Sequence, residues 1–190
     1  MASPTKINVS EVNSLSDEQF ESVFGGVIEL CKDAAVQVKK KRPFQSLEGL
    51  CDAFQTYLQE LIVILKLHPD LAGRLADLGQ LTQESTEEQK AAGLDKLTPE
   101  QKRILEERKN RYNKKFGFPF IICARENKVQ SIMDGLQVRY NNSYEQEVTI
   151  GINEVKKICK LRILDIFWYV ENVLEANLQV PLKEREVTNL

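Results

Sequence analysis

The segment SYEQEVTIGINEVKKICKLRILDIFWYVENVL, residues 143–174, decides the fold class. Its apolar residues recur every three or four positions from Val148 to Leu174, which is the spacing of one buried face of a helix. Ser143 stands at the start, where its hydroxyl is suited to cap the first turn. The segment therefore predicts one long helix near the C-terminus.

Helical patterns also occupy the first third of the chain. Ser16 followed by Gln19 predicts a capping box at the start of a first helix. A broad apolar stripe that begins after Ser46 and runs up to His68 predicts a second helix. Pro69 then makes continued helix unfavourable, so we expect His68 to lie at a helix junction.

The middle of the chain repeats this pattern. We expect a short helix over 71–78 with Gly79 as a left-handed stop, and Ser85 with Glu88 forms a second capping-box pattern. Thr98-Pro99 predicts the start of a helix that ends at Gly117.

Between Phe118 and Ala124 the chain is apolar, interrupted by proline and too short for a typical helix, so this segment should be extended. Helical spacing returns at Val129. Strands do not alternate with helices as a doubly wound sheet requires, and the fold class is predicted to be all-α, a single-domain helical bundle with one short extended segment.

Composition excludes several classes of function. A chain of 190 residues with 42% hydrophobic content suits one domain, and 26 basic against 28 acidic residues leave no positive field for nucleic acid. The most apolar run, Leu61 to Leu67, is too short to cross a membrane, and Met1 to Ser10 lack a signal core. Four cysteines without a CxxC pair and a single histidine predict no metal site; the thiols should be buried in an intracellular protein.

Physical reasoning alone leaves each candidate functional residue open. A lone histidine such as His68 is more often a surface residue or a partner of a helix C-terminus than a catalyst. The extended segment 118–124 is either core or a strip that presents backbone groups to a heterocycle. Arg125 and Arg162 are ordinarily solvated or ion-paired, although either is able to bind a carboxylate.

The order of several short blocks changes these odds. HPDLAG at 68–73, STEEQ at 85–89 with AGL at 92–94, and NKKFGFPFI at 113–121 follow one another, and EVKKI at 154–158 with Leu161-Arg162 comes last. This order resembles the family of 2-oxo-4-hydroxy-4-carboxy-5-ureidoimidazoline (OHCU) decarboxylases over most of the chain. One departure is the stretch between Phe44 and His68, which is shorter than the family pattern and has Ile62-Val63-Ile64-Leu65 where a polar turn between two helices is usual.

The resemblance implies cofactor-free decarboxylation of OHCU to (S)-allantoin in urate degradation. It implies that His68 is the catalytic acid or base and that Glu88, which precedes Gln89, is its carboxylate partner. The substrate-binding residues that it implies are Pro69, Ser85, Thr86, Glu87, Glu88, Gln89, Phe120, Ile121, Ile122, Cys123, Ala124 and Arg162.

Further expectations concern assembly and location. The family resemblance implies a homodimer, and the C-terminal Thr188-Asn189-Leu190 loosely resembles a peroxisomal address, with the cytosol as the alternative. We expect residues 1–180 to form the helical domain and 181–190 a flexible tail. The competing hypothesis is a non-enzymatic helical interaction module, which predicts no pocket around His68.

Overall fold

The computed structural model describes residues 7–59 and 63–167, and this part of the chain is helical. Within it the only β-type pairing is a single bridge between Ile7 and Phe167. The prediction of an all-α chain is confirmed. The α-helices and 3₁₀ turns are, in order, α1 (Val9–Ser14), α2 (Asp17–Phe24), α3 (Asp33–Val38), η1 (Lys39–Lys41), α4 (Leu47–Gln59), α5 (Ile64–Leu67), α6 (Arg74–Asp77), α7 (Gln83–Ala92), η2 (Leu94–Lys96), α8 (Pro99–Phe116), η3 (Ala124–Glu126), α9 (Val129–Arg139) and α10 (Tyr144–Ile166).

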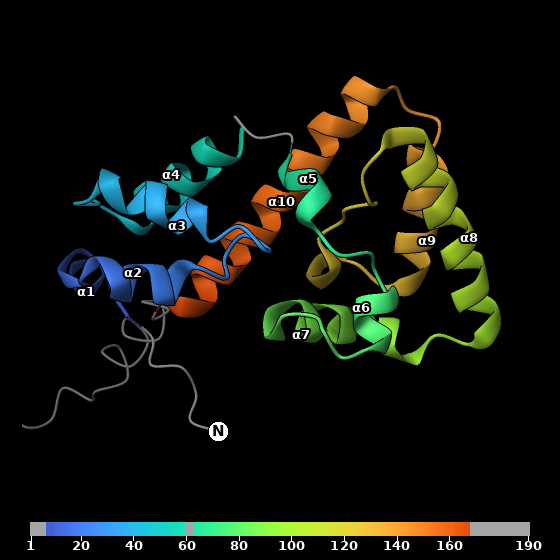
Figure 1. Cartoon of the computed structure of the whole chain (residues 1–190), viewed down its shortest axis with the longest axis horizontal. Coiled ribbons are helices and arrows are strands. Elements are labelled where there is room, and N and C mark those ends of the chain that lie inside the picture. Colours follow the sequence, from blue (N-terminus) through green and yellow to red (C-terminus); the bar gives the residue numbers. More distant parts are fainter. Residues whose placement is uncertain (1–6, 60–62, 168–190) are drawn as a thin grey trace, which may run out of the picture.

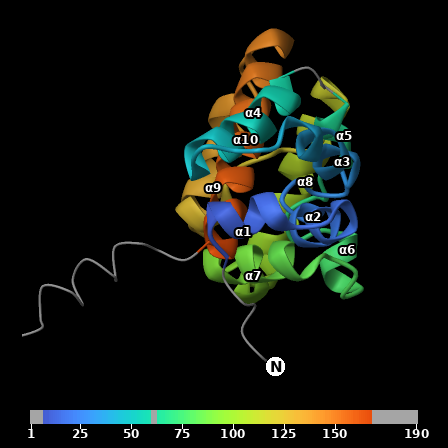
Figure 2. The same ribbon diagram turned by 90° about the vertical axis from the view of Figure 1, so that its left-hand side faces the viewer.

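The long helix α10 organises the bundle. Figure 1 shows α1 to α4 on one side of α10 and α8 with α9 on the other. Helices α4 and α5 pack directly on α10, and the turned view in Figure 2 again shows α4 beside it. One hydrophobic core extends in sequence from Val12 to Phe167, which confirms the single-domain bundle.

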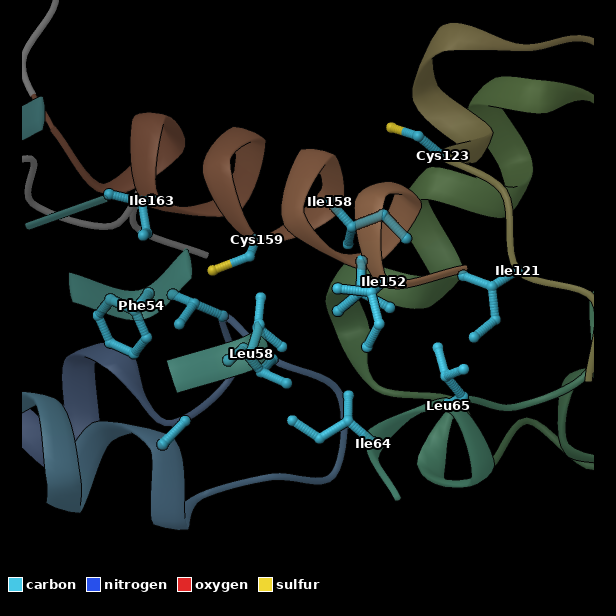
Figure 3. Close-up of a cluster of buried hydrophobic side chains, with 14 of the residues drawn as sticks. Phe54, Leu58, Ile64, Leu65, Ile121, Cys123, Ile152, Ile158, Cys159 and Ile163 are labelled. Atoms are coloured by element: carbon cyan, nitrogen blue, oxygen red, sulfur yellow. The ribbon is translucent and has the colours of Figure 1, made fainter. Parts of the chain in front are cut away.

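The core along α10 is built from aliphatic and aromatic side chains of three helices. Phe54 and Leu58 of α4 lie against Cys159 and Ile163 in Figure 3, while Leu65 of α5 lies farther along the same helix. A β-carbon at Gly151 of α10 would come within 3.0 Å of the Leu65 side chain. Glycine at this position therefore lets α5, and with it His68, approach α10 closely.

Most predicted helix ends are confirmed. Ser16 and Ser143 each cap their helix in a capping box, and Thr98 does the same before Pro99. Gly79 and Gly117 adopt φ values of +64° and +76° where α6 and α8 end. The starts follow from capping side chains, and the two ends follow from glycine's access to left-handed backbone.

Three predicted boundaries are corrected. The stripe from Leu47 toward His68 forms two helices, α4 and the short α5, rather than one. The short helix α6 covers only 74–77 because the left-handed backbone at Ala72, with φ +45°, delays its start. At the other end α10 stops at Ile166 and Phe167 is extended. The predicted continuation to Leu174, the tail 181–190 and the C-terminal tripeptide lie outside the described residues.

The segment after α8 is extended as predicted, except that its last residue, Ala124, begins the 3₁₀ turn η3. It passes from Phe118 to Cys123 with both end residues buried.

The cysteines at 51, 123 and 159 are buried free thiols, and Cys31 is half-buried. Among the described helices none has the length and apolar content of a membrane span.

Candidate active site

Arg162 of α10 lies at the centre of a buried polar cluster. Its Nε and Nη2 donate to the two carboxylate oxygens of Glu88 at 2.8 and 2.7 Å. Its Nη1 donates to Glu29 Oε2 at 2.8 Å and to the Gly26 carbonyl at 3.0 Å, and Nη2 also donates to Ser85 Oγ at 3.2 Å. A guanidinium has five N–H donors, so every donor of Arg162 has an acceptor.

The same cluster fixes the charge of Arg162. The side chain is 4% exposed, and burial disfavours its charged form. The hydrogen bonds and charges of Glu88 and Glu29 outweigh burial and raise the pKa of Arg162 above its usual value. The site therefore contains a permanent positive charge held between two carboxylates.

Three polar residues on one face of helix α7 point toward this cluster. Ser85, Glu88 and Gln89 are separated by three and four positions, so they project from the same side of the helix. Ser85 Oγ donates to Glu29 Oε2 at 2.8 Å. The predicted capping box of Ser85 and Glu88 is wrong: α7 begins earlier, and Thr82 caps it by accepting from the Ser85 amide. Ser85 and Glu88 are thereby free to face Arg162.

His68 terminates α5 and points into the same region. Its Nδ1 lies 3.2 Å from the carbonyl oxygen of Ile64, one turn earlier. A carbonyl only accepts, so the neutral ring carries its proton on Nδ1 and leaves a lone pair on Nε2. Nε2 is buried, and no residue in the described part of the chain hydrogen-bonds to it.

Burial also sets the protonation state of His68. Desolvation lowers its pKa to about 4, although the Ile64 carbonyl and the charge of Glu29 act in the opposite direction. Arg162 adds a smaller lowering effect. The imidazole is therefore neutral near pH 7, with Nε2 available as a proton acceptor.

The extended segment after α8 forms another wall of the site. Side chains of α8, α9 and α10 hold it in place. Arg139 of α9 donates to the Ile121 carbonyl at 2.8 Å, and its guanidinium carbon lies 4.4 Å from the centre of the Phe120 ring. Arg139 is paired in turn with Glu147 of α10 at 2.8 Å, and Glu147 is fully buried. The Tyr112 hydroxyl donates to the same carboxylate. This network fixes the segment without helical or sheet hydrogen bonds.

The chain after α5, helix α7, the segment after α8 and helix α10 enclose one pocket. Its empty volume is about 400 Å³ when open solvent is included, and the space that admits the centre of a water-sized sphere is about 40 Å³. The walls combine a neutral imidazole, an arginine-bound carboxylate, an amide and several apolar side chains. The residues that line it are His68, Pro69, Leu71, Ser85, Glu88, Gln89, Phe120, Ile121, Ile122, Ala124, Ile158 and Arg162.

Comparison with known proteins identifies the family of this chain. A family model described as OHCU decarboxylase matches residues 13–164. A Xenopus laevis OHCU decarboxylase is 40% identical over 166 residues, covering 85% of this chain and 95% of the relative. The enzyme of that name from Amia calva is 41% identical over 84% of this chain and 94% of its own length. The chain belongs to the OHCU decarboxylase family.

Solved structures agree with the family and the fold. The crystal structure of an OHCU decarboxylase in the presence of (S)-allantoin matches with a TM-score of 0.60 and 25% identity, covering 80% of this chain and 99% of that one. A crystal structure of (S)-allantoin synthase matches with a TM-score of 0.67 at 20% identity, which shows a shared fold. OHCU decarboxylases are carboxy-lyases, so the chain is placed among enzymes.

Most of the site residues that the family resemblance implies converge in the pocket. Thr86 and Glu87 do not: Thr86 donates to the Thr82 carbonyl and lines a second hollow, and Glu87 is exposed and accepts from Gln83. Cys123 is also outside the lining, with its side chain buried and its amide bonded to Glu154. The interaction-module hypothesis predicted no pocket at His68, and the pocket contradicts it.

The expected contact between His68 and Glu88 is absent from this structure. Both Glu88 oxygens accept from Arg162, and the Ile64 carbonyl orients the imidazole instead. Arg125, the other arginine considered from the sequence, forms a surface pair with Asp165 at 2.6 and 3.0 Å. The geometry therefore assigns the buried charge to Arg162.

Three residues at the site were not singled out from the sequence. Glu29 is 3% exposed and is the second carboxylate of the cluster, while Leu71 and Ile158 complete the pocket wall. The only signal for Glu29 is an acidic residue inside the apolar run VIEL at 27–30. A charge in such a run requires a buried partner, which here is 133 positions away in Arg162.

Proposed function

We propose that this protein decarboxylates OHCU to (S)-allantoin in urate degradation, with His68 in proton transfer. The observation that carries the proposal is that the family blocks at 68–73, 85–89, 113–124 and 161–162, far apart in sequence, contribute walls of one pocket. Membership of the OHCU decarboxylase family supports the substrate and the reaction.

The substrate supplies its own electron sink. The bond between the ring carbon and the carboxylate breaks, carbon dioxide leaves, and the electron pair forms a double bond to the neighbouring ring carbon, while the displaced imine pair moves to the imine nitrogen, which takes a proton from solvent. A proton is then delivered to the ring carbon that becomes the stereocentre, while the hydroxyl on the decarboxylated carbon loses its proton and becomes a carbonyl. The protein must hold the ring in one orientation and manage these protons.

Nε2 of His68 is suited to the first proton transfer. The Ile64 carbonyl fixes the tautomer in which Nε2 is unprotonated, and the low pKa keeps the free ring neutral. When it accepts the substrate hydroxyl proton, the imidazolium becomes the acid that returns a proton to carbon. Delivery from a fixed side chain accounts for a single enantiomer.

Glu88 is proposed as the carboxylate that works with His68 across the bound substrate. Its side chain is 12% exposed, and its bidentate pair with Arg162 holds it at the pocket wall. A negative charge there stabilises the imidazolium that forms when His68 takes a proton. Ser85 supports this arrangement by bonding to Arg162 and Glu29 together.

The test is a rate measurement with freshly generated OHCU, following the optical activity of allantoin. Wild-type protein should accelerate formation of the (S) enantiomer, and His68→Asn should reduce turnover by about 10²- to 10⁴-fold while keeping the helical circular dichroism. A well-folded His68→Asn protein with the wild-type rate would refute the assignment. Wild-type protein that does not accelerate the reaction would refute the function itself.

Assembly and location complete the proposal. Family membership supports a homodimer, which light scattering of the purified protein would contradict by a mass near 21.8 kDa. We propose peroxisomal import through Thr188-Asn189-Leu190. A fluorescent protein fused upstream should be punctate with the intact tail and diffuse without the last three residues; diffuse fluorescence in both cases would indicate the cytosol.

A further inference from the structure

Lys109 of α8 is buried close to the pocket although it does not line it. The residue is 3% exposed, and its Nζ donates to the Leu71 carbonyl at 2.8 Å. Its ion-pair partner is Glu106, one turn earlier on the same helix, at 2.9 Å. A lysine is almost never fully buried without a partner, and here its second partner is the backbone of a pocket-wall residue.

The Leu71 carbonyl is one end of a peptide unit whose other end is the Ala72 amide. That amide donates to Gln89 Oε1 at 2.8 Å. A backbone N–H is only a donor, so the Gln89 atom that meets it must be the amide oxygen. The other end of the Gln89 amide, its NH₂ group, is then left for the pocket that Gln89 lines.

Gln89 needs such a restraint because it lies between two hollows. Besides the active-site pocket, it lines a second hollow together with Ala72, Ala76 and Leu94. A glutamine amide between two open spaces is free to rotate unless a hydrogen bond fixes one end. The backbone that fixes it is itself unusual, since Ala72 adopts φ +45°, a left-handed conformation that alanine rarely takes.

We infer that Lys109 is a positioning residue which, through the Leu71–Ala72 peptide, turns the NH₂ group of Gln89 toward a carbonyl or carboxylate oxygen of the substrate. The ammonium polarises the peptide, the polarised Ala72 amide is a stronger donor to Gln89, and the Gln89 NH₂ becomes a stronger donor in turn. Through this chain of hydrogen bonds the buried ammonium of Lys109 strengthens the Gln89 NH₂ as a donor to the substrate, although Lys109 itself does not touch the substrate. This inference rests on the proposed function for its substrate, but the coupling between Lys109 and Gln89 does not depend on it.

Lys109→Met tests the coupling in the ligand-free protein. Methionine keeps most of the side-chain length and removes the donor and the charge; Lys114→Met, an exposed position on the same helix, is the matched control. In ¹⁵N NMR spectra the Ala72 amide should exchange with solvent at least tenfold faster in Lys109→Met, and the Gln89 side-chain NH₂ signals should shift. Lys114→Met should leave both unchanged. Wild-type exchange and shifts in folded Lys109→Met would overturn the inference.

Kinetics with OHCU separate positioning from a structural role. We expect Lys109→Met to raise KM about tenfold with kcat changed less than threefold. In a Gln89→Leu background the same substitution should change kcat/KM by less than twofold, because Lys109 then has no amide to position. A tenfold effect in both backgrounds would overturn the inference.

Two further variants test the inference if Lys109→Met does not fold. Lys109→Gln keeps an uncharged donor for Leu71 and should give a smaller rise in KM. Gln89→Glu keeps the acceptor for the Ala72 amide and removes the NH₂, so it should preserve Ala72 protection and raise KM at least tenfold; an unchanged KM would overturn the orientation assigned to Gln89. If wild-type protein does not act on OHCU, the function fails, while the NMR comparison still decides the coupling.

Discussion

The pH dependence of folding should reveal the buried His68. Desolvation lowers the pKa of this imidazole from 6.5 to about 4 in the folded protein. Because the folded state disfavours the charged ring, the stabilisation is complete above about pH 6.5 and is lost as pH falls toward about 4. At roughly 1.4 kcal/mol per pH unit, this pKa change corresponds to about 3 kcal/mol in total.

The chain offers a clean experiment because it contains a single histidine. Between pH 7 and pH 5 the wild type should lose about 2 kcal/mol more free energy of unfolding than His68→Asn, which has no imidazole. Carboxylates titrate in both proteins, so their contribution cancels in the difference. Urea denaturation followed by circular dichroism at pH 7, 6 and 5 measures it.

A direct titration gives an independent reading. The Cε1 proton of the only histidine gives one NMR resonance, which should move with a midpoint near 4 in the folded protein. Parallel stability curves for wild type and His68→Asn, or a midpoint near 6.5, would refute the burial argument. They would also remove the reason to regard Nε2 as a free base at neutral pH.

Three other perturbations test the polar networks. Glu147→Gln should destabilise the fold by about 3 kcal/mol because Arg139 is left buried without a counter-charge, whereas the exposed Glu145→Gln should cost under about 1 kcal/mol in the same urea titrations; equal effects would contradict the network. Arg162→Lys should lower both stability and turnover, since an ammonium cannot replace five directed donors, and wild-type kinetics would contradict that reasoning. Gly151→Leu should lower the thermal midpoint by forcing α5 away from α10; an unchanged midpoint would show that Leu65 yields freely.

Local chemistry in the sequence was sufficient for most helix ends and for the fold class. Ser16, Thr98 and Ser143 cap their helices because each is followed by a glutamine that completes the capping box. Ser85 with Glu88 has the same spacing but lies inside a helix, since Thr82 offers an earlier cap. The hydroxyls of both Thr82 and Ser85 bond to Glu29, and Ser85 also accepts from Arg162, so the start of α7 involves partners far away in the sequence.

The pocket was predictable only where its residues sit in recognisable blocks. Glu29 was missed because a single acid in an apolar run has no local partner, and its partner in the fold is 133 positions away. Lys109 was missed for the same reason, since its contact with Leu71 spans 38 positions. The partner of a buried charge is set by contacts between segments far apart in the sequence. The spacing of residues within one helix does not reveal such contacts.

The occupied guanidinium of Arg162 constrains how the substrate binds. All five donors already have acceptors, so a substrate carboxylate gains a hydrogen bond to Arg162 only by displacing Glu88, Glu29, Ser85 or the Gly26 carbonyl. Displacing either carboxylate would leave a negative charge buried without its partner, at a cost that one new ion pair does not offset. Donors that remain available, such as the Gln89 NH₂, are therefore better placed to hold the substrate oxygens. We therefore propose that Arg162 acts mainly by holding Glu88 at the wall of the pocket that His68 also lines.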